Sequence, residues 1–177
     1  MRKVLLLFSF MLLFSFGLER EFGVKLGYLF GSYDSVYGGD KDINSIETFS
    51  VYGALSSEAP QGFTAGLSLE LVTSNDFDDN LAWSYTGIEL NPFAQIQFSE
   101  KLNLYAGFGP SLNRFKEKVG NSSNESTSLG IQFMVGGKYR IWETTGLILE
   151  YKLKNFITGD YDNTLLHHIN VGLFFSF

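Results

Sequence analysis

Charged residues recur at alternate positions within apolar segments of the sequence, and they are its main candidates for chemistry. Three acids and five bases lie at such positions: Glu70, Glu89, Glu150, Lys25, Lys138, Arg140, Lys152 and Lys154. In an extended chain, alternate residues share one face. Charges enclosed on such a face must be paired, because an isolated buried charge is costly. We therefore predict an ion-pair network of five residues: Lys25, Glu70, Glu89, Glu150 and Lys152. It would form either a polar plug or a gated ion path.

Nucleophilic catalysis is the second chemistry to weigh, and the sequence offers it little. Such catalysis needs a nucleophile beside a positioned base. The only histidines, His167 and His168, are adjacent, so alternation directs them to opposite faces. The chain has no cysteine, which excludes thiol catalysis, disulfides and thiolate metal sites. We predict no catalytic residue and no cofactor.

Metal binding has one candidate segment, the acidic run 76–80. It begins like a calcium loop, but Leu81 stands where such a loop needs glycine. Gly87 stands where the bidentate glutamate belongs. We therefore predict a solvated acidic loop and no metal site. Irregular calcium capture by Asp76, Asp78 and Asp79 is the alternative.

The elements that would hold the charged face are β-strands. Period-two alternation runs through eight segments, and each has one face without a charged residue. The segments are 22–30, 49–55, 63–71, 86–98, 102–112, 129–139, 147–153 and 169–177. This pattern predicts an all-β, antiparallel, up-and-down barrel of eight strands, each of roughly 10–13 residues.

The connections between these segments alternate in length. Long ones are expected at about 31–45, 74–84, 115–127 and 157–165. Short ones are expected near 57–61, 99–101 and 142–145. Long loops on one side of a membrane and tight turns on the other are typical of a transmembrane barrel with both termini on the short-turn side.

Alternation alone leaves open which face is inside, and a soluble lipocalin-like barrel would turn its apolar face inward. Aromatic residues near the strand ends favour an apolar face toward lipid, as two interfacial girdles. One girdle is expected from Phe22, Phe98, Tyr139, Trp142, Phe175 and Phe177. The other is expected from Phe30, Phe49, Trp83, Tyr85 and Phe115.

The amino terminus reads as an export signal. Arg2 and Lys3 precede the apolar run 4–16, which ends at Gly17. This is the pattern of a cleavable signal peptide, so we predict a signal peptide at 1–17 and a single barrel domain at 18–177. The 177 residues suit one domain, and the net charge of −6 argues against a nucleic-acid partner.

Four segments carry a family resemblance: 104–109, 136–140, 146–153 and the terminal strand 170–177. The last has a polar Asn170, then Gly172, then aromatic Phe175 and Phe177. Together they resemble the outer-membrane β-barrel domain family, the small OmpA-like, OmpX-like and opacity-type eight-stranded barrels. The resemblance implies that these four terminal-strand residues are an assembly signal read by the barrel-insertion machinery.

The same resemblance sets the functional expectations. It implies the outer membrane of a Gram-negative-type bacterium, with outer-membrane lipid and lipopolysaccharide as partners and without a peptidoglycan-binding domain. Lipid A deacylase barrels have a serine two residues after their catalytic histidine, whereas Asn170 follows His168 at that spacing. We therefore expect a structural or surface-interaction protein, adhesion included, with a plugged polar lumen and an extracellular ligand left open. The alternatives are a narrow ion or small-solute channel and a soluble periplasmic lipocalin-like carrier.

Overall fold

The computed structural model describes residues 18–59, 63–77, 81–162 and 164–177. The signal peptide predicted at 1–17 lies outside the described residues. The described chain forms eight β-strands, and each includes all or nearly all of one of the eight alternating segments of the sequence. They are β1 (Glu19–Asp34), β2 (Asp40–Ala59), β3 (Phe63–Phe77), β4 (Leu81–Gln97), β5 (Leu102–Val119), β6 (Ser122–Trp142), β7 (Thr145–Phe156) and β8 (Leu165–Ser176). The predicted segments 86–98 and 169–177 each extend one residue past their strand.

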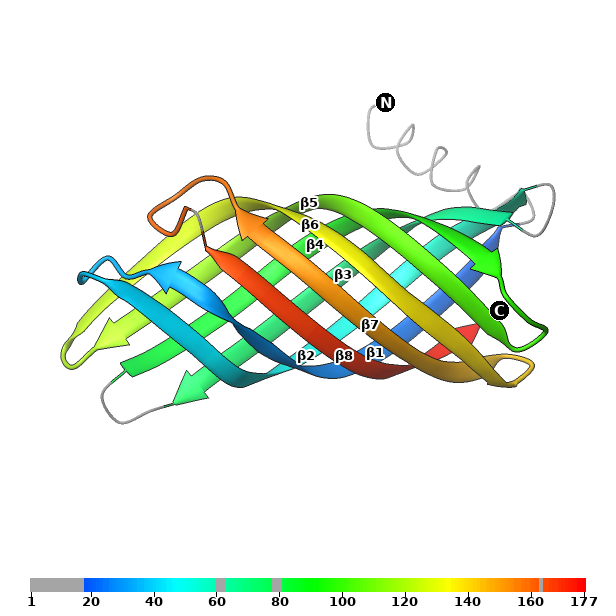
Figure 1. The fold of residues 1–177 in the computed structure, drawn as a ribbon, viewed down its shortest axis with the longest axis horizontal. Coiled ribbons are helices and arrows are strands. Elements are labelled where there is room, and N and C mark those ends of the chain that lie inside the picture. Colours follow the sequence, from blue (N-terminus) through cyan, green and yellow to red (C-terminus); the bar gives the residue numbers. More distant parts are fainter. Residues whose placement is uncertain (1–17, 60–62, 78–80, 163) are drawn as a thin grey trace, which may run out of the picture.

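The strands form one closed antiparallel barrel in sequence order, because β1 pairs with β8 from Glu21↔Ser176 to Ser32↔Leu165. Strand β1 begins and β8 ends at the same end of the barrel (Figure 1), where the backbones of Arg20 and Phe177 exchange hydrogen bonds. We call this the terminal end, and the opposite one the hairpin end. Within the described residues, no helix is long and apolar enough to cross a membrane.

Three of the four predicted long loops are mostly strand. The register continues to Asp34↔Asp40 in the first hairpin and to Val119↔Ser122 in the third. Strands reach 21 residues, in β6, instead of the expected 10–13. The alternation weakens here because outward residues near the hairpin tips are polar, although the backbone pairing persists. Only the β7–β8 connection, 157–164, is a long loop.

The apolar faces of the strands point outward. Phe108 is 66% exposed and Leu149 is 59% exposed, whereas Glu89 and Lys154 are fully buried. Every residue of the charge-free faces identified in the sequence is at least partly exposed. The exterior is therefore the larger apolar surface, and the buried charges lie in the interior, the reverse of a lipocalin-like carrier.

The aromatic girdles are only partly as predicted. Phe30 and Phe49 are on the exterior, as are the six aromatic residues assigned to the terminal end. Trp83, Tyr85 and Phe115 are buried inside, so their assignment to a girdle was wrong. These three residues have the inward parity of their strands, and at the hairpin end their rings pack against one another from the neighbouring strands β4 and β5.

The interior is layered along the barrel axis, as the inward residues of β7 illustrate. Ile148 belongs to an apolar layer toward the terminal end, together with Tyr52, Phe93 and Phe174. Glu150, Lys152 and Lys154 follow at alternate positions and form a charged layer. Phe156 then enters an aromatic layer at the hairpin end. Charge is thus enclosed between two apolar layers.

Candidate functional site

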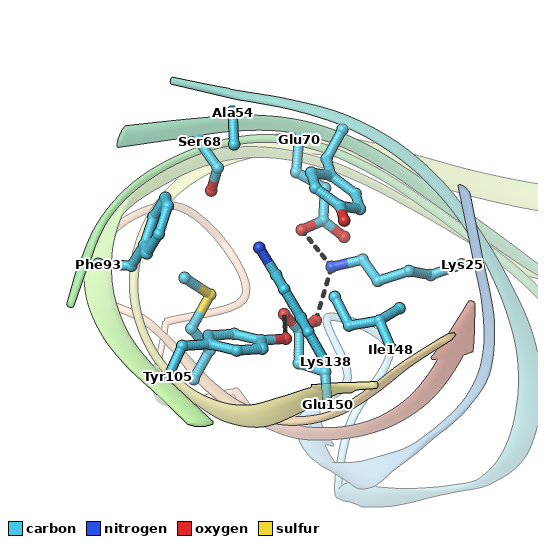
Figure 2. Close-up of a pocket in the computed structure, with 11 residues that line it drawn as sticks. Lys25, Ala54, Ser68, Glu70, Phe93, Tyr105, Lys138, Ile148 and Glu150 are labelled. Atoms are coloured by element: carbon cyan, nitrogen blue, oxygen red, sulfur yellow. Dashed lines mark hydrogen bonds and ion pairs between the residues drawn. The ribbon is translucent and has the colours of Figure 1, made fainter. Parts of the chain in front are cut away.

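The charged layer is a network of six buried residues, which we call the central network: Lys25, Glu70, Glu89, Glu150, Lys152 and Lys154. Each of the six is at most 3% exposed. Lys25 Nζ lies 2.7 Å from both Glu70 Oε2 and Glu150 Oε1 (Figure 2). Lys152 Nζ lies 2.9 Å from Glu70 Oε2 and 2.6 Å from Glu89 Oε2. The structure thus brings together the five residues of the predicted network.

Lys154 is the sixth member, and the predicted network omitted it. Its ammonium pairs with the second oxygen of Glu89 and also contacts the hydroxyl of Tyr85. Three lysines therefore face three glutamates, so the layer carries no net charge. Lys154 lies on β7 and Glu89 lies on β4. These two strands are not neighbours in the barrel, since β4 pairs with β3 and β5 and β7 pairs with β6 and β8. Alternation marks both as inward, but it does not show which strands face each other across the lumen.

Neutral side chains complete the network. Tyr105 Oη donates a 2.9 Å hydrogen bond to Glu150 Oε2. Asn170 Nδ2 donates to Glu150 Oε1 at 3.1 Å. Buried ion pairs are stable only where such additional hydrogen bonds satisfy the remaining polar atoms. The carboxylate of Glu150 is thus held by two lysines, a phenol and an amide.

Toward the terminal end, a second ion pair lies inside the barrel. Lys138 Nζ lies 2.6 Å from Glu21 Oε1, and Tyr52 Oη donates to the same oxygen at 2.7 Å. The Lys138 ammonium also lies over the rings of Phe93 and Tyr105, 5.3 Å from each centroid. The cavity between this pair and the central network has a volume of about 20 Å³, enough for a single water molecule.

Toward the hairpin end, three hydroxyl groups surround the buried carboxylate of Glu117. Tyr33 Oη and Ser35 Oγ donate to its Oε1 at 3.0 and 2.6 Å. Tyr161 Oη donates to Oε2 at 3.3 Å. These donors come from the β1–β2 hairpin and the β7–β8 loop, whereas Glu117 is on β5, so one buried carboxylate ties three parts of this end together. The prediction assigned Glu117 to a loop and therefore gave it no inward parity.

Burial raises the pKa of Tyr161 to about 12, and the nearby Glu117 carboxylate adds to this effect. Tyr161 is in the connection outside the strands. Both causes disfavour the phenolate, so the neutral hydroxyl remains a hydrogen-bond donor to Glu117 over the ordinary pH range.

The two histidines point to opposite faces of β8. His168 is 1% exposed and faces the lumen near the Tyr85 ring. His167 lies on the outer wall, where its ring stacks on Phe30 at 4.9 Å between centroids and its Nδ1 lies 2.7 Å from Tyr151 Oη. The two imidazole rings thus lie on different surfaces of the barrel, so they cannot act together as general bases on one substrate.

The terminal-strand residues divide between the two faces. Phe175 and Phe177 are outward, 42% and 75% exposed. Asn170 is inward, in the network, and Gly172 is inward beside Lys25. A Cβ at Gly172 would lie 2.7 Å from Lys25 Cγ. Asn170 therefore completes the hydrogen bonds of the central network, and Gly172 leaves room for it.

The predicted acidic loop is described only in part. Asp78 and Asp79 lie outside the described residues. In the part of the chain that the structure describes, no group of three or more His, Asp or Glu side chains is arranged to hold a metal ion.

A family model described as outer membrane protein beta-barrel domain matches residues 4–177. The chain belongs to this family. It is therefore a transmembrane β-barrel of the outer membrane, as its exposed apolar exterior requires. Among curated proteins, none matches the chain.

Solved structures share the fold at low identity. Neisserial surface protein A has 17% identity and a TM-score of 0.64, over 88% of this chain and 97% of its own. The attachment invasion locus protein Ail of Yersinia pestis has 12% identity and a TM-score of 0.61, over 89% and 98%. The N-terminal barrel of Pseudomonas aeruginosa OprF has 13% identity and a TM-score of 0.51, over 88% and 97%. At these identities the likeness concerns the fold alone.

Proposed function

We propose that this protein is a non-conducting outer-membrane barrel that presents its extended hairpins at the cell surface. The observation that carries the proposal is the neutral central network, enclosed between two apolar layers and leaving a cavity of only about 20 Å³. An eight-stranded barrel is just wide enough for side chains to fill it. The barrel then serves as a rigid support, and function resides in the parts beyond the membrane.

A surface role is supported by the shape of the hairpin end. Strands β5 and β6 continue as a pair to Val119↔Ser122, well past the last outward apolar pair Leu112↔Leu129. The Glu117 contacts fasten this hairpin to the first hairpin and to the β7–β8 loop. A rigid platform of this kind suits recognition of another surface, adhesion included. Two proteins of the same fold are named for surface and attachment roles.

The alternative of a narrow channel would need the central network to open. Moving an ion past Lys25 and Glu150 would separate charges 2.7 Å apart, both on buried side chains. Breaking one partner from a buried ion pair costs about 3–5 kcal/mol. We therefore favour the plug.

We infer no catalytic role. His168 is the only buried histidine, and its neighbours in the lumen are the Tyr85 ring and the charged layer. The Tyr85 hydroxyl is hydrogen-bonded to Lys154 and Asn113 and not to His168, so it is not paired with this histidine as a nucleophile with its base. The alternative of a soluble carrier would need an apolar interior, and this interior carries the charges.

The partners follow from this assignment. The outward face meets outer-membrane lipid and lipopolysaccharide, and the hairpin end faces the cell exterior. We further propose that Asn170, Gly172, Phe175 and Phe177 form the signal read by the barrel-assembly machinery. The side chains of Phe175 and Phe177 point outward and are exposed, so another protein can contact them, as this role requires.

Two measurements test the proposal. Membrane fractionation with a heat-modifiability gel should place the protein in the outer membrane, with different mobility before and after boiling. Purified barrel in planar lipid bilayers should give no reproducible single-channel openings. Stable openings of one amplitude would contradict the plug, and recovery from the soluble periplasm would contradict the membrane barrel.

A further inference from the structure

A row of cations continues the outer wall of β5 beyond its apolar part. Arg114, Lys116 and Lys118 alternate with the buried Phe115 and Glu117, so all three side chains point outward. In a strand, alternate residues lie about 6.8 Å apart, so the row extends over about 14 Å. We call it the β5 basic strip.

The position of the strip relative to lipid is fixed by the strand register. The outward residues Ile88, Leu112 and Leu129 pair across β4, β5 and β6, and each is 47–49% exposed. The next outward row is Thr86, Arg114 and Thr127. The apolar surface thus ends at one row on all three strands, and the strip begins at the next.

The strip begins at the height of a headgroup layer and continues above it. With strands tilted by about 45°, each step of two residues rises about 5 Å along the barrel axis. Arg114 then lies about 5 Å beyond the last apolar row, Lys116 about 10 Å and Lys118 about 15 Å. The polar headgroup region of one leaflet is about 5–7 Å thick, so it includes the level of Arg114, and the two lysines lie above it. Flexible lysine side chains can reach back toward it with their ammonium groups.

Two of the three cations of the strip have no ion-pair partner among the described residues. Arg114 is bound to Glu125, with Nε and Nη2 at 2.8 and 2.5 Å from Oε1. Among the described residues, neither Lys116 nor Lys118 has an ion-pair partner. The outward neighbours of Lys116 on the adjacent strands are Ser84 and Glu125, and Glu125 is already engaged by Arg114. Two ammonium groups without an ion-pair partner in the described part of the chain therefore lie on residues that pair with Ser84 and Ser123, whose hydroxyl groups can also donate to phosphate oxygens.

We propose that the β5 basic strip binds the phosphate groups of anionic lipids in the outer leaflet. The inference rests on the proposed membrane orientation, in which the hairpin end faces outward. A basic segment beside a membrane attracts anionic lipid through each cation near the surface. Binding on β5 would fix the rotational setting of the barrel among its lipids and the height of the β5–β6 hairpin above them.

The test compares two variants with the same change in net charge. Barrel folded in mixed micelles of phosphatidylglycerol and phosphatidylcholine is examined by native mass spectrometry for retained lipid. We expect the wild type to retain phosphatidylglycerol in preference. Lys116→Gln with Lys118→Gln should reduce that retention at least about tenfold at low salt. The control, Lys41→Gln with Lys101→Gln, removes two cations away from the strip and should stay within about twofold of wild type.

Several results would overturn the proposal. Equal loss in both variants would make the effect one of net charge alone. Equal retention of phosphatidylcholine would make it apolar contact. A dimer that disappears with the Lys116 and Lys118 substitutions would assign the strip to a protein partner. All three proteins are checked for heat modifiability first, so a barrel that fails to fold is distinguished from one that folds without binding lipid.

Discussion

Glu89 illustrates how individual residues determine the stability of this interior. Its two oxygens contact Lys152 and Lys154, and its side chain is fully buried. It lies directly opposite Glu70 in the β3–β4 register, a pairing of like charges that is unfavourable unless cations intervene. Lys152 intervenes, since it contacts both acids. Lys152 therefore offsets the repulsion between Glu70 and Glu89, and the two acids in turn offset the cost of burying its ammonium group.

A substitution at Glu89 should therefore cost more than one at a surface pair. We expect Glu89→Gln to lower the free energy of unfolding by about 3–5 kcal/mol, because two buried lysines lose their shared partner. Glu125→Gln removes the exposed partner of Arg114 and should cost about 0–1 kcal/mol. Urea unfolding of vesicle-folded barrel, followed by tryptophan fluorescence, measures both. Equal losses would mean that the network does not stabilise the barrel.

Tyr161 gives a pH prediction at the same scale. Its pKa is raised to about 12 in the folded protein from an ordinary value of 10.0, so the neutral form favours the folded state. The stabilisation is complete below pH 10 and is lost as pH rises through about 12. In absorbance titrations at 295 nm, the difference between wild type and Tyr161→Phe should have its midpoint near 12. Glu117→Gln should lower that midpoint, and a midpoint near 10 in wild type would contradict the buried contact.

At the residue scale, the sequence identifies inward charges better than their partners. Alternation assigns Glu70, Glu150 and Lys25 to the charged face from local pattern alone. Pairing across the lumen depends on barrel width and strand tilt, so the role of Lys154 was not evident. Glu117 was missed for another reason. In its part of β5 the outward residues are polar, so the inward and outward faces do not differ in hydrophobicity and the alternation cannot be recognised.

At the scale of elements, strands fit together because inward glycines lie beside large side chains. A Cβ at Gly23 would lie 2.4 Å from the Tyr52 ring, and one at Gly66 would lie 2.5 Å from Phe93. The rings of Tyr52 on β2 and Phe93 on β4 thus occupy the space beside glycines of neighbouring strands. This complementarity lets large side chains fit into a narrow lumen.

An inward glycine should therefore tolerate a methyl group less well than an outward one. A Cβ at Gly172 would lie 2.2 Å from the Val24 carbonyl oxygen, whereas at Gly53 the nearest atom is 4.0 Å away. We expect Gly172→Ala to destabilise the barrel by about 1–3 kcal/mol. Gly53→Ala, a matched outward control in a strand, should be neutral or slightly stabilising. Equal unfolding midpoints in urea for the two variants would contradict this account.

Strand number and order were predictable, because eight charge-free faces separated by turns leave few alternatives to a meander. Strand length was not. The segments around Tyr33, Trp83 and Phe115 were assigned to loops or girdles, although they are paired strands with inward aromatic rings. Outside the lipid, an outward residue gains nothing from being apolar, so the two faces no longer differ in the sequence.

At the scale of the whole molecule, the barrel combines an apolar exterior, a neutral charged centre and a polar hairpin end. Its family and membrane location agree with the orientation of its faces. The charges at the hairpin end are unevenly distributed. The β5 wall has the basic strip, whereas the first hairpin, on strands far around the barrel from β5, has the exposed Asp34, Asp40 and Asp42. Partners that approach from different sides therefore meet different electrostatic surfaces.

The central network also has a consequence for how the chain enters the membrane. Lys25 is on the first strand, and its partners Glu70 and Glu150 are 45 and 125 residues away. A partial barrel would leave unpaired charges in contact with hydrocarbon, so strands inserted one at a time would each be strongly disfavoured. Insertion should be concerted, with neutralisation of charge and closure of the β1–β8 seam in one step.

Two single-tryptophan variants test this prediction. Trp83→Phe leaves Trp142 as a fluorescent reporter at the terminal end, and Trp142→Phe leaves Trp83 as a reporter at the hairpin end. Stopped-flow insertion into vesicles should give the same rate with both, and separate rates would indicate a stepwise path through a charged intermediate.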